Sequence, residues 1–175
     1  MATLKIPVSD QDHIQGNAKA ACTLVEYGDY ECPNCGAAYP LVKQIQAHMG
    51  KQLRFVFRNF PMTRLHPNAQ AAAETAEFAG SKGKFWAMHD LLYENQQQLS
   101  QSSFAQLAKA LKLDPAELQQ ALAAKTFADR VSEDFSGGVR SGVNGTPTFY
   151  INGQRYDDPM DLDSMVAAIQ KALAS

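Results

Sequence analysis

Two cysteines separated by two residues, in the sequence Cys32-Pro33-Asn34-Cys35, constrain the fold of this chain more than any other feature. They follow an apolar, β-branched run at residues 22–27, which predicts a buried strand. Apolar residues at helical spacing after them predict a helix from about Pro33 to Met49. Pro33 suits a first helical turn, where its missing N–H breaks no hydrogen bond. The pattern therefore predicts two thiols on the first turn of a helix that follows a strand.

This position favours reversible thiol–disulfide chemistry. The sulfur of Cys32 would face unpaired backbone N–H groups and the positive end of the helix dipole, and both stabilise a thiolate. The thiolate is the attacking species in disulfide exchange, and a low pKa also makes a better leaving group. We predict that Cys32 is the nucleophile and that Cys35, one turn deeper, resolves the mixed disulfide. Asp29 and Glu31 would raise the pKa of Cys32 if solvent does not screen them, because nearby negative charge disfavours a thiolate.

Two other uses of this cysteine spacing stay open, a structural zinc site and an inert disulfide. A structural zinc site needs four ligands. The remaining candidate ligands are scattered along the chain, at Cys22, His13, His48, His66 and His89. Structural disulfides usually close longer loops. Next to a predicted strand–helix unit the spacing favours redox chemistry, so we predict no metal and no cofactor other than the cysteine pair.

The composition indicates one domain with its own hydrophobic core. The 175 residues are 45% hydrophobic and 19% charged, and the net charge is −2 without a basic block. We therefore expect neither a nucleic acid nor a membrane as a partner. Residues 1–21 contain no secretory apolar segment. This predicts a cytoplasmic protein as the sequence stands, and a periplasmic one if a leader has been removed.

A long helical block interrupts the strand-forming parts of the chain. Residues 53–58 predict a second strand, which would complete a right-handed βαβ unit with the first. From about Asn68 to Val139 the chain is rich in Ala, Gln, Leu and Lys and has no strand-like run. Strand character returns at residues 148–151, where Asn152-Gly153 predicts a hairpin turn before the last helix. We predict three segments, namely 1–61 and 141–175 as two parts of an α/β domain and 62–140 as the insertion.

Several other residues are expected to have roles in the fold and not in the chemistry. Cys22 is expected to be a buried apolar residue of the first strand. Ser102 or Ser103 is expected to cap one helix of the block, and Asp114 with Pro115 to open another. His66 is expected in a loop or cap and His89 on an amphipathic helix face. Residues 1–21 are expected to form an irregular arm or a short edge strand.

With these elements in place, the chain resembles the thioredoxin superfamily and, within it, the DsbA-like oxidoreductases. The resemblance is carried by Cys32-Pro33-Asn34-Cys35, Glu26, Pro40 and Thr146-Pro147, and it covers residues 22–173. Further matching stretches are residues 23–27, 58–61, 66–69, 85–86 and 145–153. The resemblance implies an α/β protein, with a thioredoxin fold that carries an inserted all-helical subdomain.

The resemblance also implies roles for individual residues. Pro147 would follow a cis peptide bond and face the cysteines, leaving the backbone of Thr146 free to pair with an incoming peptide. Glu26 would be a buried acid beneath the site that shuttles the proton of Cys35. Pro33 and Asn34 would contact the substrate together with Thr146 and Pro147.

One departure from the family bears on redox strength. Asn34 stands where the archetypal periplasmic oxidant has a histidine, so this position carries no charge that would stabilise the thiolate. The departure argues against extreme oxidising power.

The sequence predicts a dithiol–disulfide oxidoreductase that acts on protein thiols and depends on an unidentified redox partner. A glutathione-dependent transferase or isomerase related to the kappa class stays open as an alternative. It would use one Ser or Cys nucleophile, and the second thiol, Cys35, argues against it. A non-catalytic peptide-binding module that uses the Pro147 edge is the other alternative.

Overall fold

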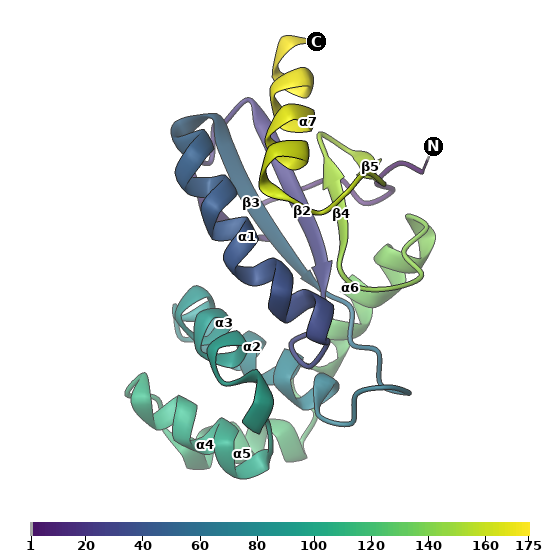
Figure 1. Ribbon diagram of the computed structural model, residues 1–175. Coiled ribbons are helices and arrows are strands. Elements are labelled where there is room, and N and C mark those ends of the chain that lie inside the picture. Colours follow the sequence, from purple (N-terminus) through teal and green to yellow (C-terminus); the bar gives the residue numbers. More distant parts are fainter. Residues whose placement is uncertain (1) are drawn as a thin grey trace.

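The computed structural model describes residues 2–175 and contains one mixed five-stranded sheet with helices on both of its faces (Figure 1). The strand order is β1-β3-β2-β4-β5, in which β2 and β3 are parallel and the other neighbours are antiparallel. The strands are β1 (His13–Gly16), β2 (Cys22–Gly28), β3 (Leu53–Asn59), β4 (Thr148–Ile151) and β5 (Gln154–Tyr156). The α/β class and the thioredoxin-like fold predicted from the sequence are confirmed.

The helix α1 (Pro33–Met49) connects the parallel strands β2 and β3, as the βαβ pattern predicted. Cys32 is its N-cap residue, Pro33 occupies the first turn, and the helix continues through Pro40. It ends at Gly50, whose φ of 54° lies in the left-handed region that glycine adopts without strain. A short 3₁₀ helix, η1 (Gly50–Gln52), leads into β3.

The chain between β3 and β4 is helical, as the composition predicted. Most of its helices lie beyond one end of the sheet, the end at which β2 is followed by α1 (Figure 1). The exception is α6, which runs behind the sheet. They are α2 (Ala69–Ser81), α3 (Phe85–Glu94), η2 (Gln96–Gln98), α4 (Gln101–Ala110), α5 (Pro115–Ala123) and α6 (Ala128–Arg140). The boundaries at residues 62 and 140 remain predictions.

The helix caps confirm one prediction and correct another. Asp114 caps α5 with its side chain, and Pro115 takes the first helical position. The cap of α4 is Ser100, so the prediction of Ser102 or Ser103 was wrong. Ser103 lies at the third helical position and forms a capping box, in which Ser100 and Ser103 accept each other's backbone N–H.

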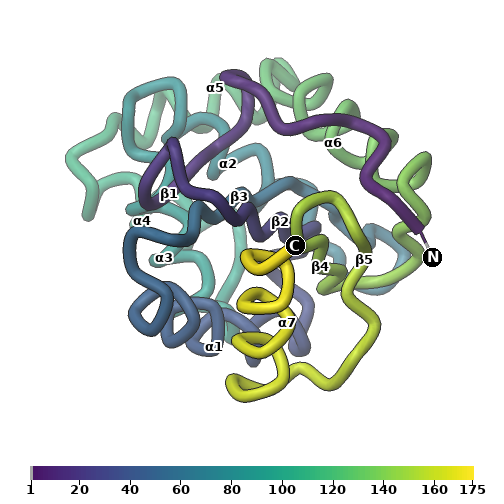
Figure 2. Tube along the Cα trace, turned by 90° about the horizontal axis from the view of Figure 1, so that it is seen from above, coloured from purple at the N-terminus to yellow at the C-terminus, as the bar shows by residue number. Residues whose placement is uncertain are grey.

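The sheet is buried on both faces, and successive side chains of a strand enter opposite cores. Leu24 and Glu26 point towards α1 and α7 (Leu162–Ala174), where the larger hydrophobic cluster lies. Val25 and Tyr27 belong to a second cluster on the opposite face. Figure 2 shows α1 and α7 on one side of the sheet, with α6 and the N-terminal arm on the other.

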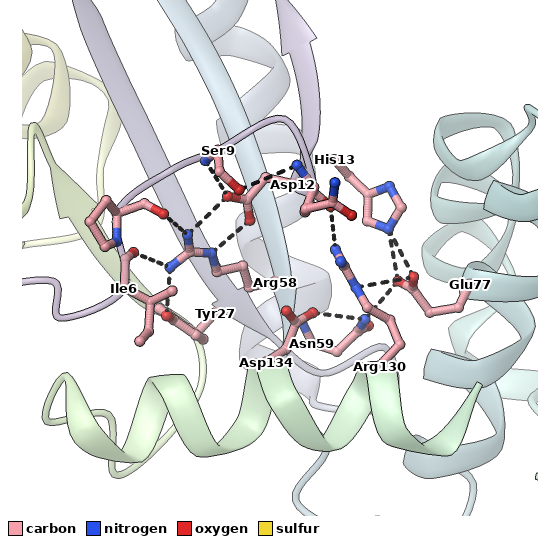
Figure 3. A network of polar contacts seen from close by, with 12 residues as sticks. Ile6, Ser9, Asp12, His13, Tyr27, Arg58, Asn59, Glu77, Arg130 and Asp134 are labelled. Atoms are coloured by element: carbon pink, nitrogen blue, oxygen red, sulfur yellow. Dashed lines mark hydrogen bonds and ion pairs between the residues drawn. The ribbon is translucent and has the colours of Figure 1, made fainter.

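The N-terminal arm, residues 2–12, is attached to the sheet by the side chain of Arg58 on β3 (Figure 3). Arg58 donates to both carboxylate oxygens of Asp12 at 2.8 and 3.0 Å and to the hydroxyl of Tyr27 at 2.9 Å. It also donates to the backbone carbonyls of Ile6 and Pro7. The arm then continues into β1, which pairs with β3, so residues 13–16 form the edge strand that was one of the two expectations.

Candidate active site

The two cysteines differ in their access to solvent. Cys32 precedes the first turn of α1 with an exposed fraction of 6%, whereas Cys35 is completely buried. The backbone N–H of Cys32 donates to the carbonyl of Asp29 at 3.1 Å, and the N–H of Gly36 donates to the carbonyl of Cys32 at 3.0 Å. Both cysteines are free in this structure.

Electrostatics separate the two thiols further. The pKa of Cys32 is lowered to about 5, first of all by a hydrogen bond from the Cys35 thiol, and burial only partly offsets this. A hydrogen bond from the side chain of Thr146 and others from the backbone N–H groups of Asn34 and Cys35 lower the pKa of Cys32 as well. Burial raises the pKa of Cys35 far above its ordinary value. At neutral pH the pair thus consists of a Cys32 thiolate and a Cys35 thiol.

The peptide bond between Thr146 and Pro147 is cis, as expected from the resemblance. The carbonyl oxygen of Thr146 lies 3.5 Å from the Cys32 sulfur, although the two residues are far apart in the sequence. Thr146 and Pro147 are partly exposed, and Pro33 and Asn34 are exposed on the first turn of α1. The cysteine turn therefore lies beside an accessible stretch of backbone at the start of β4.

Glu26 lies on β2, on the face of the sheet that α1 covers, and is only 1% exposed. Its pKa is raised to about 8, mainly by burial and also by the negative charge of Cys32. One carboxyl oxygen, Oε1, has no hydrogen-bond partner among the described residues. The charge of Glu26 in turn raises the pKa of Cys35, so the protonation of these two groups is coupled.

The acidic residues before Cys32, Asp29 and Glu31, are held by hydrogen bonds and do not form a solvated loop. Asp29 is buried, and its carboxylate accepts hydrogen bonds from the N–H groups of Glu31 and Met62 and from Nδ1 of His66, at 2.8, 2.9 and 2.7 Å. The carboxylate of Glu31 accepts from the backbone and side-chain nitrogens of Asn68, at 2.7 and 2.8 Å. Both charges are therefore satisfied by the segment that precedes α2.

His89 lies on the buried side of its helix, α3. It is buried, and its Nδ1 atom lies 2.9 Å from the hydroxyl of Tyr30. Burial lowers the pKa of His89 to about 3, so the ring is neutral. The rings of Phe57 and Tyr93 meet it edge-on. His89 is thus a core residue that supports Tyr30 in the loop before the cysteines.

Among residues 2–175 no three side chains of His, Cys, Asp or Glu are grouped to hold a metal ion. Within this range no helix is long and apolar enough to cross a membrane.

The fold, the cysteine turn and the neighbouring cis-proline together define a thioredoxin-superfamily protein. A family profile described as thioredoxin matches residues 8–171, so the chain belongs to this family. Within the superfamily the chain is DsbA-like, because its structural neighbours are DsbA-like proteins that match it over nearly their whole length.

Three solved structures illustrate this similarity. BdbD from Bacillus subtilis is 27% identical, with a TM-score of 0.88 and 99% coverage of both chains. A thioredoxin-like oxidoreductase from Silicibacter pomeroyi is 24% identical, with a TM-score of 0.81 and 95% coverage of both chains. The α-DsbA1 protein of Wolbachia pipientis is 19% identical, with a TM-score of 0.80 and coverage of 98% of this chain and 94% of that one.

Curated relatives of higher identity are much longer proteins. The Na(+)/H(+) antiporter NhaA 1 of Salinispora arenicola is 42% identical over 172 residues, which are 98% of this chain and 26% of the relative. NhaA 3 of Salinispora tropica is 41% identical over 173 residues, with the same coverage. The chain therefore spans about a quarter of the length of these relatives.

Proposed function

We propose that the protein exchanges a Cys32–Cys35 disulfide with the thiols of other proteins, with Cys32 as the nucleophile and Cys35 as the resolving thiol. The observation that carries this proposal is the contrast between the two sulfurs. Cys32 keeps an exposed fraction of 6% and has a pKa lowered to about 5, whereas Cys35 is completely buried and retains its proton. A site with one attacking and one resolving sulfur needs such a difference.

In the oxidising direction a substrate thiolate attacks the sulfur of Cys32, and the Cys32–Cys35 bond breaks. Cys35 leaves as a thiolate and takes up the proton of Glu26, whose raised pKa keeps it protonated at neutral pH. A second substrate thiolate then attacks the substrate sulfur of the mixed disulfide. Cys32 leaves as the stabilised thiolate, and two electrons have moved from the substrate to the cysteine pair. In the reducing direction the same steps run in reverse.

The backbone beside Cys32 supports a peptide substrate. The carbonyl of Thr146 lies 3.5 Å from the Cys32 sulfur, where it can accept a hydrogen bond from the N–H of an extended peptide. Pro147 would keep this carbonyl accessible, while Pro33 and Asn34 would contact the substrate from the other side of the sulfur. The redox partner would use the same surface, because it must also reach Cys32.

Cysteine variants test the proposal with insulin as the disulfide substrate. Cys32→Ser should abolish reduction of insulin, and Cys35→Ser should accumulate a mixed disulfide that mass spectrometry detects after acid quenching. Cys22→Ser is the matched control, because Cys22 is a buried thiol outside the site, and it should retain both properties. Full activity of the Cys32→Ser variant would disprove the assignment.

A further inference from the structure

One side chain of the helical insertion, Gln96, binds the backbone of the cysteine turn itself. This residue begins η2, the short 3₁₀ helix between α3 and α4. Its amide nitrogen Nε2 donates one hydrogen bond to the carbonyl of Tyr30 at 2.9 Å and another to the carbonyl of Cys32 at 2.8 Å. Both hydrogens of the amide are therefore used on the backbone that precedes α1.

These two bonds fix two peptide groups that precede α1, namely those of Tyr30–Glu31 and Cys32–Pro33. The carbonyl of Cys32 also accepts the N–H of Gly36 at 3.0 Å, so both of its lone pairs are engaged. A carbonyl held from two directions fixes the peptide plane between Cys32 and Pro33. The orientation of that plane determines whether the Cys32 sulfur points at the N–H groups of Asn34 and Cys35, which stabilise its thiolate.

The sequence leaves space for this contact at Gly36. A Cβ atom at position 36 would overlap with Oε1 of Gln96 and come within 3.0 Å of its Nε2 atom. The backbone of Gly36 is helical and has no positive φ, so other residues could adopt its conformation. Glycine is thus needed here for the room it gives to the amide of Gln96, and not for its flexibility.

We propose that Gln96 is a positioning residue of the redox site, and that its amide aims the Cys32 sulfur at the first turn of α1 by holding the carbonyls of Tyr30 and Cys32. This inference rests on the proposed function and extends it, since it makes the helical insertion a part of the site. Sequence patterns gave no sign of Gln96, because it lies in a run of three glutamines and meets its partners more than sixty positions away.

The first test compares Gln96→Leu with Gln97→Leu. Leucine has nearly the volume of glutamine but no donor, and Gln97 is an exposed neighbour in the same 3₁₀ helix. The pH dependence of iodoacetamide alkylation at Cys32 reports its thiolate, and equilibration with glutathione buffers reports the reduction potential. We expect Gln96→Leu to raise the pKa of Cys32 by about one unit and to make the potential more negative. Gln97→Leu should behave as wild type.

The second test uses the fit between Gly36 and Gln96. Gly36→Ala should raise the pKa of Cys32 in the wild-type background, because the methyl group displaces the amide of Gln96. In the Gln96→Ala background the same substitution should change nothing, since the colliding side chain is absent. Alanine favours a helix more than glycine does, and it stands at position 36 in both the single and the double variant. A raised pKa of Cys32 is therefore not explained by a loss of helix at this position.

These outcomes separate the two proposals. If wild type shows a reversible couple and Gln96→Leu leaves both the Cys32 pKa and the potential unchanged, the role of Gln96 is disproved and the proposed function stands. If Gly36→Ala raised the pKa of Cys32 equally in the wild-type and Gln96→Ala backgrounds, this result would also disprove the role of Gln96. If wild type shows no reversible couple, the proposed function itself fails.

Discussion

The Nδ1 atom of His66 lies 2.7 Å from the buried carboxylate of Asp29, and this contact ties the segment after β3 to the loop that carries the cysteines. The backbone of Asp29 contacts both cysteines. Its carbonyl accepts the N–H of Cys32 at 3.1 Å, and its own N–H points at the sulfur of Cys35 at 3.5 Å. The position of Asp29 therefore determines a hydrogen bond to the resolving sulfur.

Removal of this contact should slow the resolving step. In His66→Ala the Asp29 N–H loses its fixed direction towards Cys35, whose thiolate forms when the mixed disulfide is made or resolved. We expect mixed disulfides between Cys32 and glutathione to resolve about 2- to 10-fold more slowly, since a hydrogen bond contributes about 0.5–1.5 kcal/mol. Quenched-flow alkylation with mass readout measures this rate.

Two further variants control this prediction. His66→Asn keeps a donor near the position of Nδ1 and should restore most of the rate. His48→Ala removes an exposed histidine from the other end of α1 and should have no effect. Equal rates in His66→Ala and wild type would contradict the role of this contact.

Periodic local patterns explain why so much of the fold was predictable. The strands β2 and β3 and the helix α1 follow from apolar runs and from the Pro33 and Gly50 signals, each of which acts within one turn of the chain. The cysteine pair was equally predictable, because both thiols lie on one helical turn. The cis bond before Pro147 followed from the resemblance.

Contacts between distant segments were not predictable in the same way. His66 meets Asp29 across 37 positions, and nothing near His66 distinguishes it from a loop histidine. The burial of His89 could not be predicted because its helix has apolar residues on several sides, and only the packing against Phe57 and Tyr93 buries it. Ser100 was missed because three serines within four residues compete for one cap.

The burial of Glu26 should make stability depend on pH. Its pKa is about 8 in the folded state and about 4.5 in the unfolded chain, so the folded state holds a proton that the unfolded state has lost. The contribution of Glu26 to stability should therefore fall as the pH rises from about 4.5 to about 8, whereas the lowered pKa of Cys32 contributes with the opposite sign above about pH 5. At pH 7 this lost stability amounts to about 3 kcal/mol, at 1.36 kcal/mol for each unit of pKa shift.

Urea denaturation of reduced Glu26→Gln at pH 5 and pH 8 measures this effect. Relative to wild type, the variant should gain stability between pH 5 and pH 8, because its amide does not titrate while the contribution of Cys32 is present in both proteins. Glu117→Gln removes an exposed carboxylate and should keep the wild-type dependence. A parallel pH dependence in Glu26→Gln and wild type would show that Glu26 titrates normally.

The ion pair of Arg58 and Asp12 should be essential for anchoring the N-terminal arm. Its atoms lie 2.8 Å apart, and both side chains are less than 10% exposed. Arg58→Met leaves a buried carboxylate without its partner and should cost about 3–5 kcal/mol in the free energy of unfolding. Burial acts to raise the pKa of Asp12, but the hydrogen bonds from Arg58 and from the backbone of Ser9, together with the charges of Arg58 and Arg130, outweigh it, and the pKa is lowered.

The lowered pKa of Asp12 predicts how the destabilisation by Arg58→Met changes with pH. A lowered pKa contributes stability above the unfolded value of 3.8, and this contribution is lost as the pH falls through the folded value. The difference between wild type and Arg58→Met should therefore shrink below about pH 4. Lys43→Met is the control, because the pair of Lys43 and Asp90 is partly exposed and should contribute less than about 1 kcal/mol.

Cys22 should have no part in the redox couple. It lies at the start of β2 and is completely buried, and burial raises its pKa to about 11. Cys22→Ala should cost about 1 kcal/mol in stability, as is typical of a substitution that removes one buried atom, and should leave the potential unchanged. A changed potential would mean that Cys22 exchanges disulfides with the Cys32–Cys35 pair.

The lowered pKa of Cys32 predicts a moderately oxidising couple. Thioredoxin has a nucleophile pKa of about 7 and a potential of about −270 mV, and each unit by which the pKa falls raises the potential by about 30 mV. A pKa of about 5 for Cys32 therefore places the couple at about −210 mV. This is well below the value of about −120 mV known for the strong oxidant DsbA, in agreement with the uncharged Asn34.

Equilibration with glutathione buffers, followed by alkylation and mass readout, measures this potential, and Cys22→Ala removes the third thiol from the assay. Asn34→His should raise the potential, because a cationic ring beside the thiolate stabilises the reduced form, whereas Gln44→His on an exposed part of α1 should not. A wild-type potential below about −250 mV would mean that the Cys32 thiolate is hardly more stable than that of thioredoxin, and the protein would then act as a reductant.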